Sequence, residues 1–341
     1  MRTSILVTGG AGYIGSHTCK ALHEAGFRPV VYDDLSNGHR EAVCWGPLVE
    51  GDVRDAAALT RAMREHGVTG VIHFAGLIEV GRSMTRPDLF WDHNLNGVLA
   101  VLGAMRSADV KRLVFSSSAA VYGTPQAGLE KLEEGAALKP INPYGDSKLA
   151  GERLIASSCA AFGLEGVALR YFNAAGADPD GELGEAHSPE THLIPLAIEA
   201  AMGAGPALTV FGRDFPTRDG SCVRDYIHVC DLARAHVLAL GLDLPAGGFE
   251  ALNLGTGRGA SVLEVIEAVS RACARTPPVI IGPRRAGDPP MLVADAARAQ
   301  VMLGWRPRFL DLQATIDSAV AWRARPRFGP SAAIERMTAV A

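Results

Sequence analysis

A glycine-rich turn near the N-terminus constrains the fold of this chain more than any other feature. The apolar residues 5–7 precede glycines at positions 9, 12 and 15, and a helix-like run covers residues 13–25. Consecutive apolar residues are typical of a strand buried on both faces of a parallel sheet. A strand, a glycine turn and a helix N-terminus together form an anion site, because unpaired N–H groups and the helix dipole attract a phosphate.

A second strand and an acid complete the pattern of a dinucleotide site. The apolar residues 29–32 end in Asp33, eighteen residues after Gly15. An acid at this place binds the hydroxyls of the adenosine ribose. The spacing G-x-x-G-x-x-G alone would indicate only a tight turn, but strand, glycines, helix, strand and acid in this order favour dinucleotide binding. A carboxylate repels the 2′-phosphate of NADP, so NAD is favoured, although Arg40 is close enough to leave NADP open.

Regular alternation of strands and helices follows this stretch and predicts an α/β fold. We expect strands at 48–50, 71–74, 112–115 and 166–170, and helices at 56–66, 88–107 and from Pro143. Repeated units of this kind predict a Rossmann-like doubly wound parallel sheet, whose ligands bind outside the carboxyl ends of the strands. Gly9, Asp33, Gly51, Gly76 and Ser118 would then lie at one edge.

The second half of the chain is less regular and predicts a smaller mixed α/β substrate lobe. Short strands are expected at 207–211, 226–228, 250–254 and 279–281, and helices at 190–202, 229–240, 261–273 and 310–325. With 341 residues the chain can form one large or two fused domains. We predict an NAD-binding domain at 1–173 and a lobe at 174–341, with interleaving of the two as an open alternative.

Composition and charge exclude several classes of protein. The net charge is −4 with Lys and Arg scattered, which does not suggest a nucleic-acid or membrane surface. No apolar run approaches the length of a transmembrane helix, and the first strand begins too early for a signal peptide, so the cytoplasm is expected. The six cysteines form no C-x-x-C pair, and we expect them to be reduced. No cluster mixes His with Cys or acids at ligand spacing, so no metal site is expected.

The segment 142–148 carries the strongest chemical signal. Asn142 can cap a helix and Pro143 suits its first position. Tyr144 and Lys148 then lie on one face of that helix at positions i and i+4. A free tyrosine titrates near pH 10, and a nearby ammonium is expected to lower its pKa by stabilising the phenolate. The pair could then move a proton on or off a hydroxyl, whereas in isolation it would indicate an ordinary surface helix.

Three serines follow the strand at 112–115. A hydroxyl at this position could hydrogen-bond a reacting oxygen, although a serine-rich strand end can also cap backbone groups. The residue types alone do not say which of Ser116, Ser117 and Ser118 points inward.

Taken together, these features resemble the extended short-chain dehydrogenase/reductase superfamily over nearly the whole chain. Five further motifs narrow the resemblance to the UDP-glucose 4-epimerase family: residues 74–77 (FAGL), 115–123 (FSSSAAVYG), 169–173 (LRYFN), 223–229 (VRDYIHV) and 284–288 (RRAGD). The resemblance implies interconversion of UDP-galactose and UDP-glucose by transient hydride transfer to bound NAD and rotation of a 4-keto intermediate. It also implies a homodimer, with the helices at 88–107 and 143–162 as the pairing elements.

The resemblance assigns roles to individual positions. Tyr144 resembles the catalytic base, Lys148 its partner and a ligand of the nicotinamide ribose, and Ser118 the hydroxyl beside the sugar. The positions that resemble NAD contacts are Gly9, Gly12, Tyr13, Ile14, Gly15, Asp33, Asn37, Asp52, Val53, Phe74, Ala75, Gly76, Asn94, Tyr171 and Phe172. The positions that resemble contacts on the UDP-sugar side are Asn173, Leu193, Val210, Phe211, Arg224, Arg285, Asp288 and Leu292. Guanidinium groups suit the diphosphate physically, although surface ion pairing would also explain Arg224, Arg285 and Asp288.

Two positions depart from the family pattern. Ile78 stands where many members have Lys, which puts one ribose contact in doubt. Leu292 stands at a position thought to decide whether N-acetylated sugars fit, and its intermediate size leaves that question open.

Three alternatives follow from these features. UDP-N-acetylhexosamine or UDP-pentose epimerisation stays open, whereas 4,6-dehydration is disfavoured because no acidic pair follows Ser118. A non-catalytic NAD-binding regulator is the third, and the intact pair of Tyr144 and Lys148 argues against it.

Overall fold

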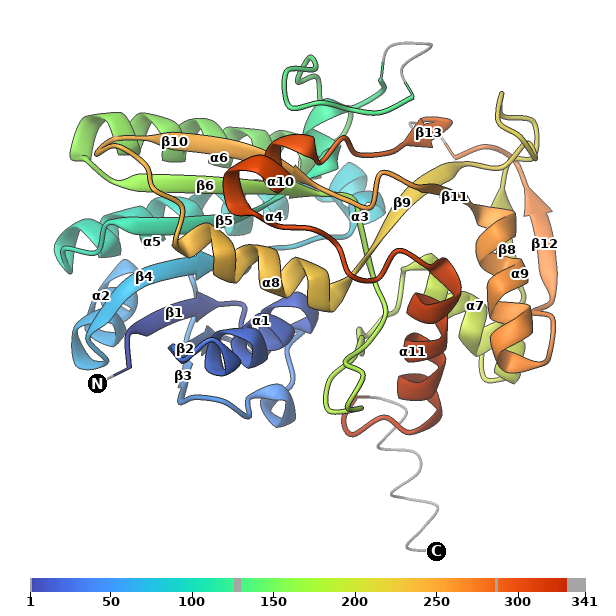
Figure 1. Cartoon of the computed structure of the whole chain (residues 1–341), viewed down its shortest axis with the longest axis horizontal. Helices are drawn as coiled ribbons and strands as arrows, with labels where there is room; N and C mark the ends of the chain where they lie inside the picture. Colours follow the sequence, from blue (N-terminus) through green and yellow to red (C-terminus); the bar gives the residue numbers. More distant parts are fainter. Residues whose placement is uncertain (1, 126–129, 286–287, 330–341) are drawn as a thin grey trace, which may run out of the picture.

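Seven parallel strands form one sheet in the order β10-β6-β5-β4-β1-β2-β3 (Figure 1). The computed structural model describes residues 2–125, 130–285 and 288–329. The strands are β1 (Ser4–Thr8), β2 (Arg28–Asp33), β3 (Leu48–Glu50), β4 (Val68–His73), β5 (Arg112–Ser118), β6 (Glu165–Tyr171) and β10 (Phe249–Leu254). The predicted doubly wound parallel sheet is confirmed.

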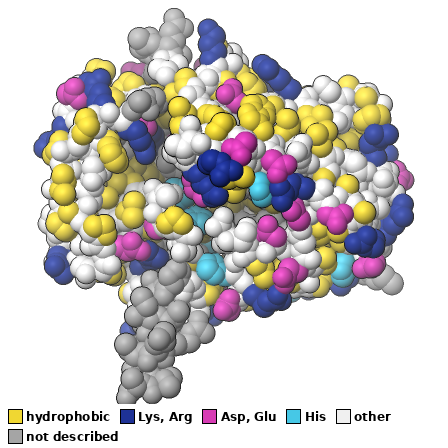
Figure 2. All heavy atoms as spheres, turned by 180° about the vertical axis from the view of Figure 1, so that it is seen from behind, with side chains coloured by type: hydrophobic (Ala, Val, Ile, Leu, Met, Phe, Trp, Pro, Cys, Tyr) yellow, Lys and Arg dark blue, Asp and Glu magenta, His cyan; other side chains and the backbone are white. Residues whose placement is uncertain are grey.

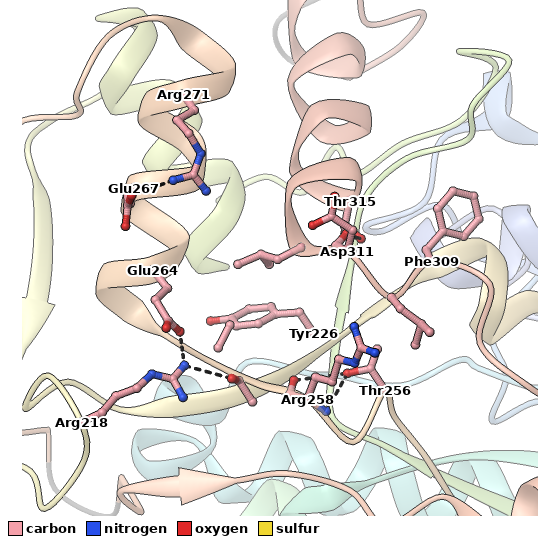
Figure 3. A pocket seen from close by; sticks show the side chains of 14 residues that line it. Arg218, Tyr226, Thr256, Arg258, Glu264, Glu267, Arg271, Phe309, Asp311 and Thr315 are labelled. Carbon is pink, nitrogen blue, oxygen red and sulfur yellow. Dashed lines mark hydrogen bonds and ion pairs between the residues drawn. The ribbon is translucent and has the colours of Figure 1, made fainter.

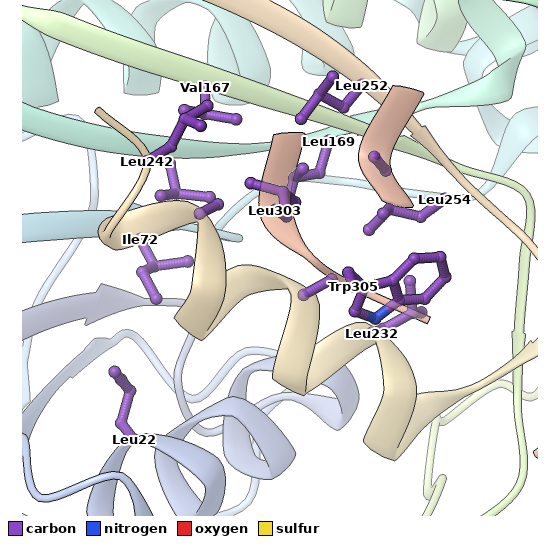
Figure 4. Packing of buried hydrophobic residues seen from close by; sticks show 14 of the residues in the cluster. Leu22, Ile72, Val167, Leu169, Leu232, Leu242, Leu252, Leu254, Leu303 and Trp305 are labelled. Carbon is purple, nitrogen blue, oxygen red and sulfur yellow. The ribbon is translucent and has the colours of Figure 1, made fainter. Parts of the chain in front are cut away.

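Helices cover both faces of this sheet, because alternate residues of each strand point to opposite sides. Ile5 and Val7 of β1 pack in one apolar cluster with α1 (Tyr13–Glu24), α8 (Val229–Leu240) and α10 (Ala297–Leu303). Leu6 packs in the other cluster, with α2 (Ala56–Glu65), α5 (Asn96–Ser107) and α6 (Pro143–Phe162). Figure 4 shows the first cluster, where Trp305 lies beside Leu232 of α8. Burial on both faces explains why β1 is entirely apolar at its centre.

The helix expected at 88–107 is interrupted. The structure has α3 (Val80–Thr85) and α4 (Pro87–Phe90), then the π-helical turn η2 (Trp91–Leu95), and then α5. Such turns often occur at functional sites because they re-aim a side chain. Here the turn contains the buried Asn94, which was expected at the cofactor site.

The second half of the chain builds a smaller lobe around two short sheets. One contains β11 (Gly259–Ser261), β9 (Val223–His228) and β13 (Met291–Leu292), with β7 (Asn173–Ala175) also on β9. The other pairs β8 (Leu208–Phe211) with β12 (Val279–Gly282). Helices α7 (Leu193–Met202), α9 (Val262–Cys273) and α11 (Leu312–Ala324) share a buried cluster that includes Ile198, Val269 and Ile316.

The chain returns from this lobe to the large sheet. Strand β10 pairs with β6 over its whole length, and α8 packs against α1 (Figure 1). The domain boundary between residues 173 and 174 stays a prediction. Because β10 and α8 follow this boundary in the sequence but pack on the large sheet and on α1, the alternative of two interleaved domains fits them.

Lys and Arg side chains are interspersed with Asp and Glu over the face that Figure 2 presents. All six cysteines are free thiols, as expected. Within the described part of the chain, no helix combines the length and the apolar character that crossing a membrane requires.

A buried ion pair fastens α6 to the sheet. Arg170 on β6 donates from Nε and Nη2 to the carboxylate of Glu152 on α6, at 2.9 and 2.6 Å. Both side chains are at most 5% exposed, and Ser117 of β5 donates to the same carboxylate. The pair therefore fixes the height and rotation of α6 over β5 and β6.

We predict that Arg170→Met lowers the free energy of unfolding by about 3–5 kcal/mol, because it leaves the Glu152 carboxylate buried without its partner. Urea denaturation measures this loss. Adding Glu152→Leu should recover much of it, since the uncompensated charge is removed. The control Arg271→Met breaks a pair with Glu267 in which both side chains are more than half exposed, and should cost less than about 1 kcal/mol. Equal losses of unfolding free energy in Arg170→Met and Arg271→Met would contradict the claim that the buried pair stabilises the fold more than the exposed one.

Candidate active site

The glycine turn lies where the strand order reverses. Strand β1 has β2 on one side and β4 on the other, and ligands of open α/β sheets bind at such a point. Gly9 has φ +71°, and a Cβ at this position would lie 2.7 Å from the backbone nitrogen of Ala75. The loop after β1 therefore contacts the segment that contains Phe74, Ala75 and Gly76. This contact is expected, because β1 and β4 are neighbouring parallel strands and both loops follow their carboxyl ends.

The N-terminus of α1 fits a dinucleotide pyrophosphate. Gly12 is its N-cap and supplies no side-chain cap, and the helix begins with Tyr13, Ile14 and Gly15. The first N–H groups of a helix need an external acceptor, and a phosphate satisfies them. The Tyr13 ring points elsewhere, because its hydroxyl donates to the carbonyl oxygen of Gly176 at 2.5 Å. Tyr13 therefore contributes its backbone to this site.

Asp33 organises the loop beside the expected ribose position. Its two carboxylate oxygens accept from the backbone N–H groups of Ala11 and Leu35, at 3.0 and 2.9 Å. Burial raises the pKa of this carboxyl group, and the two N–H donors oppose that rise. Arg40 was the residue that kept NADP as an alternative cofactor, because it could bind a 2′-phosphate. In the structure its guanidinium forms an ion pair with Glu50. Asn37 is exposed and lines a small cavity together with Gly12 and Tyr13.

The expected adenine contacts lie after β3, one strand further along. Asp52 binds Arg54, whose hydrogen bonds outweigh burial and lower the pKa of Asp52 to about 2. The Asp52 carbonyl oxygen accepts from the hydroxyl of Tyr32 at 3.0 Å. Val53 is buried against α5. These contacts hold the segment at the end of the sheet beside Asp33.

Tyr144 and Ser118 meet at the carboxyl end of β5. Asn142 caps α6 through Oδ1, which accepts from the backbone N–H of Gly145 at 2.8 Å, and Pro143 is the first helical residue. This local arrangement, predicted from the sequence, places Tyr144 in the first turn. Burial raises the pKa of the Tyr144 phenol, and a hydrogen bond with Ser118 opposes the rise. These two side chains lie 26 residues apart, and only the family resemblance singled out Ser118 among the three serines.

Lys148 lies one turn further along α6 and is buried. Its Nζ donates to the carbonyl oxygen of Ser116 at 2.8 Å and lies 5.9 Å from the centre of the Tyr144 ring. Burial lowers the pKa of Lys148 to about 8, with the nearby Glu152 opposing. The expectation that the ammonium lowers the pKa of Tyr144 is not met in this structure, because burial dominates. At neutral pH the ammonium still carries its charge.

The three serines have three different partners. Ser116 bonds the hydroxyl of Tyr171 at 2.5 Å, Ser117 donates to Glu152, and only Ser118 reaches Tyr144. Tyr171 lies close enough to Tyr144 for a charge on one to raise the pKa of the other. Ser118 is therefore the one of the three serines that lies beside the Tyr144 phenol.

Asn94 holds the loop after β4 through hydrogen bonds to the backbone of Leu77. Its Oδ1 accepts from the backbone N–H of Leu77 at 2.8 Å, and its Nδ2 donates to Ser147 at 2.9 Å. A Cβ on Gly76 would lie 2.9 Å from the same Oδ1, so any larger residue there would displace the Asn94 amide. Nδ2 also donates to the Leu77 carbonyl oxygen, so the three hydrogen bonds of the amide are all internal. We assign Asn94 a positioning role rather than a direct contact with the cofactor.

The residues expected on the UDP side gather at the edge of the smaller lobe. Asp288 lies between two arginines: Arg285 Nε donates to it at 3.0 Å, and Arg224 Nη2 lies 3.6 Å away. The Arg285 guanidinium covers the exposed Phe211 ring at 5.4 Å. These residues are ion-paired in the structure, so diphosphate binding would require them to exchange partners. Ala286 and Gly287 of the same motif lie outside the described residues.

The remaining positions of this set have different surroundings. Val210 is buried in the core of the lobe, so only its backbone is available to a substrate. Asn173 opens β7 beside Tyr226, and Leu193 begins α7. Leu292 pairs with Arg224 across β13 and β9. Ile78 is 38% exposed and contributes no polar side chain where the family pattern has Lys.

Leu292 connects the two groups of predicted residues. It packs with Phe172 against a buried cluster that contains Ala119 and Tyr122, directly after Ser118. The UDP-side strand β13 and the serine strand β5 therefore approach each other at this cluster.

An open pocket in the smaller lobe includes none of the predicted residues. Figure 3 shows its lining, with Tyr226 and Arg258 on one side and Glu264, Glu267 and Arg271 on α9. Arg218 pairs with Glu264 and Arg271 with Glu267, so these charges satisfy one another. The pocket offers no counterpart to the arrangement around Tyr144.

Sequence reasoning missed Glu152 and one further cluster. Glu152 lies at i+4 from Lys148 on α6, a spacing that could have shown it as a partner of Lys148.

The expectation that no histidine lies with acids at ligand spacing is wrong, because Glu185, His187, Glu190 and His192 converge within 4.8 Å. The loop before α7 brings them together, and no periodic pattern reveals a loop of this kind.

Comparison with known proteins places this geometry in a family. A model of the NAD dependent epimerase/dehydratase family matches residues 5–255. The chain belongs to this family. The predicted superfamily and the NAD dependence are thereby confirmed.

Relatives in the family cover nearly the whole chain. A UDP-glucose 4-epimerase of Rhizobium leguminosarum bv. trifolii is 50% identical over 322 residues, which is 94% of this chain and 98% of the relative. The crystal structure of UDP-glucose 4-epimerase from Brucella ovis in complex with NAD is 50% identical, with a TM-score of 0.90, 94% of this chain and 98% of that chain covered. The UDP-Glc/GlcNAc 4-epimerase of Campylobacter jejuni is 36% identical, with a TM-score of 0.81 and coverage of 94% and 98%.

The buried Lys148 predicts a pH dependence of stability. Its pKa is about 8 when folded and near 10.5 when unfolded, so the unfolded chain binds more protons between these values. Stability should therefore be reduced below about pH 8 and recover as the pH rises towards about 10.5. We expect wild type to gain about 3 kcal/mol relative to Lys148→Met across this window, since one pKa unit corresponds to about 1.4 kcal/mol. Parallel pH profiles of unfolding free energy for the two proteins would reject this assignment.

Proposed function

We propose that this chain is a UDP-glucose 4-epimerase that interconverts UDP-galactose and UDP-glucose. The observation that carries the proposal is the Tyr144 phenol beside Ser118, with the buried ammonium of Lys148 one helical turn away. The relatives named above support the choice of substrate.

The chain's own residues supply the proton chemistry. Bound NAD would accept hydride from C4 of the sugar and return it to the opposite face. Tyr144 acts as the base that takes the proton of the 4-hydroxyl and later gives it back. Ser118 orients that hydroxyl through its hydrogen bond to the phenol. Lys148 supplies a positive charge one helical turn from the phenol, and would have to release the Ser116 carbonyl oxygen in order to bind the cofactor ribose.

The loops hold the two ends of the ligands. The uncapped N-terminus of α1 and Asp33 would bind the pyrophosphate and the adenosine ribose. Arg224 and Arg285 would bind the UDP diphosphate by exchanging Asp288 for phosphate oxygens. Rotation of the 4-keto sugar between these fixed ends would present its second face, and exclusion of water by the bound ligands would protect the intermediate.

Replacement of one hydroxyl group tests the proposal. Tyr144→Phe should lower kcat for UDP-galactose by at least about 100-fold, since general acid–base catalysis contributes about 10²–10⁴. NAD should stay bound, because the change removes a single oxygen. Coupled detection of UDP-glucose measures the rate, and absorbance of the denatured protein measures the cofactor.

Tyr226→Phe is the matched control, because Tyr226 is a buried tyrosine of β9 outside the proposed site. It should retain activity. Full turnover in Tyr144→Phe would remove this residue from its role.

Two alternatives are separated by a substrate comparison. Leu292 is intermediate between a bulky and a small residue, so UDP-N-acetylglucosamine and UDP-xylose are assayed beside UDP-galactose. Faster turnover of either one would assign the chain to a sibling activity. No product from any of the three, with NAD bound, would favour a regulator that has kept the fold.

Homodimer formation and a cytoplasmic location belong to the same proposal. Leu99 on α5 is 49% exposed and Phe162 at the end of α6 is 44% exposed, which leaves apolar side chains on the helices expected to pair. Light scattering should give twice the mass of the chain. A monomeric mass would refute the pairing.

A further inference from the structure

We propose that Glu185, His187, Glu190 and His192 form a binding site for a divalent transition metal of the zinc class. The four residues lie in the loop before α7 and offer two imidazole nitrogens and two carboxylate oxygens. This mixed donor set suits Zn²⁺ and similar ions better than Mg²⁺ or Ca²⁺, which prefer oxygen alone. The proposal is independent of the epimerase activity.

The separations of the donor atoms fit a tetrahedral ion. With metal–ligand distances near 2.0–2.1 Å, neighbouring ligands of a tetrahedral site lie about 3.4 Å apart. Glu185 Oε1 lies 3.0 Å from His187 Nδ1, and Glu190 Oε1 lies 3.9 and 3.8 Å from Nδ1 of His187 and of His192. Glu185 also contacts His192 Nδ1, and all four ligand atoms lie within 4.8 Å of one another. Small side-chain movements would bring them to the ideal spacing.

A second observation points to a cation at this cluster. The Glu190 side chain is only 5% exposed, and its Oε2 is buried without a hydrogen-bond partner among the described residues. Its other oxygen accepts from the backbone N–H groups of Thr191 and His192, which fixes the carboxylate in the cluster. A buried carboxylate with an oxygen that lacks a donor is costly, and a cation bound by the Glu190 carboxylate would reduce that cost.

The position of the cluster suggests what a metal would do. The His187 ring meets the Tyr13 ring edge-on at 6.2 Å and lines the small cavity beside Gly12 and Asn37. His192 is the N-cap of α7, directly before Leu193. A metal would therefore tie the loop between the glycine turn and α7, and stabilise the folded chain by its binding free energy.

The nearby Asp178, Asp180 and Glu182 provide an internal comparison. They also converge within 4.8 Å, but Lys20 already contacts all three at 2.7–2.9 Å. Their charge is satisfied by this ammonium, so we assign no metal to them.

Titration of the full-length protein with Co²⁺ and Zn²⁺ tests the proposal. All proteins carry Cys44→Ser, because Cys44 is the exposed thiol and could bind these ions itself. Protons compete for the same atoms: burial lowers the pKa of His187, but the hydrogen bond with Glu185 and the negative charges of Glu185 and Glu190 outweigh it and raise the value to about 10. The titration is therefore run at mildly alkaline pH.

We expect one Co²⁺ per chain with the intense visible absorption of a four-coordinate site, and a higher Tm with Zn²⁺. His187→Gln and Glu190→Gln should each weaken Co²⁺ binding by at least about tenfold, since even outer-shell changes at metal sites cost about 10–100-fold. Both should also lose the Tm increase. The control Asp180→Asn should bind as the parent does.

Two results would overturn the proposal: no saturable binding to the parent, or equal binding by the parent and both variants. If one variant fails to fold, as its Tm without metal reveals, the other still decides the outcome.

Discussion

Helix α6 lies against strands β5 and β6, and the Glu152 carboxylate holds it there between Arg170 and Ser117. The cap by Asn142 fixes where the helix begins, and the ion pair fixes how it is turned. Tyr144 and Lys148 occupy the two turns between these fixed points. The meeting of the phenol with Ser118 is therefore a result of the packing of α6, and it depends on residues that take no part in the chemistry.

The same packing creates an electrostatic tension at Tyr144. Burial raises the pKa of the phenol, whereas a base at neutral pH needs a lower one. Lys148 is charged below about pH 8, but its ammonium is directed to the Ser116 carbonyl oxygen. For Tyr144 to act as a base, a positive charge has to approach the phenol when the ligands bind. The nicotinamide ribose, for which Lys148 is the expected ligand, is the group that would draw the ammonium away from Ser116.

The sequence predicted features that depend on neighbours along the chain. The turn from β1 to α1, the Asn142 cap and the spacing of Tyr144 and Lys148 are all set within a few residues. Apolar runs such as those of β1 and β2 also predicted the sheet, because burial on both faces leaves a continuous hydrophobic pattern. The contacts of Asn94 with Ser147 and of Glu152 with Arg170 were not predictable in this way, since these partners come from distant parts of the chain.

Contacts between segments that are distant in the sequence were also not predicted. Strand β10 adds to β6 from more than 75 residues away, and no local pattern distinguishes it from the short strands of the smaller lobe. The loop at 185–192 likewise brings two imidazoles and two carboxylates together without any periodic spacing. Such arrangements follow from the whole packing, and the structure was needed to see them.

The pKa of Tyr144 in the NAD-loaded protein, with UDP added, tests the central claim most directly. It can be measured by ultraviolet difference titration of wild type against Tyr144→Phe, which isolates one phenol among the six tyrosines. The account predicts a value clearly below that of free tyrosine, near 10. A value at or above 10 in that complex would contradict the claim that Tyr144 is the base.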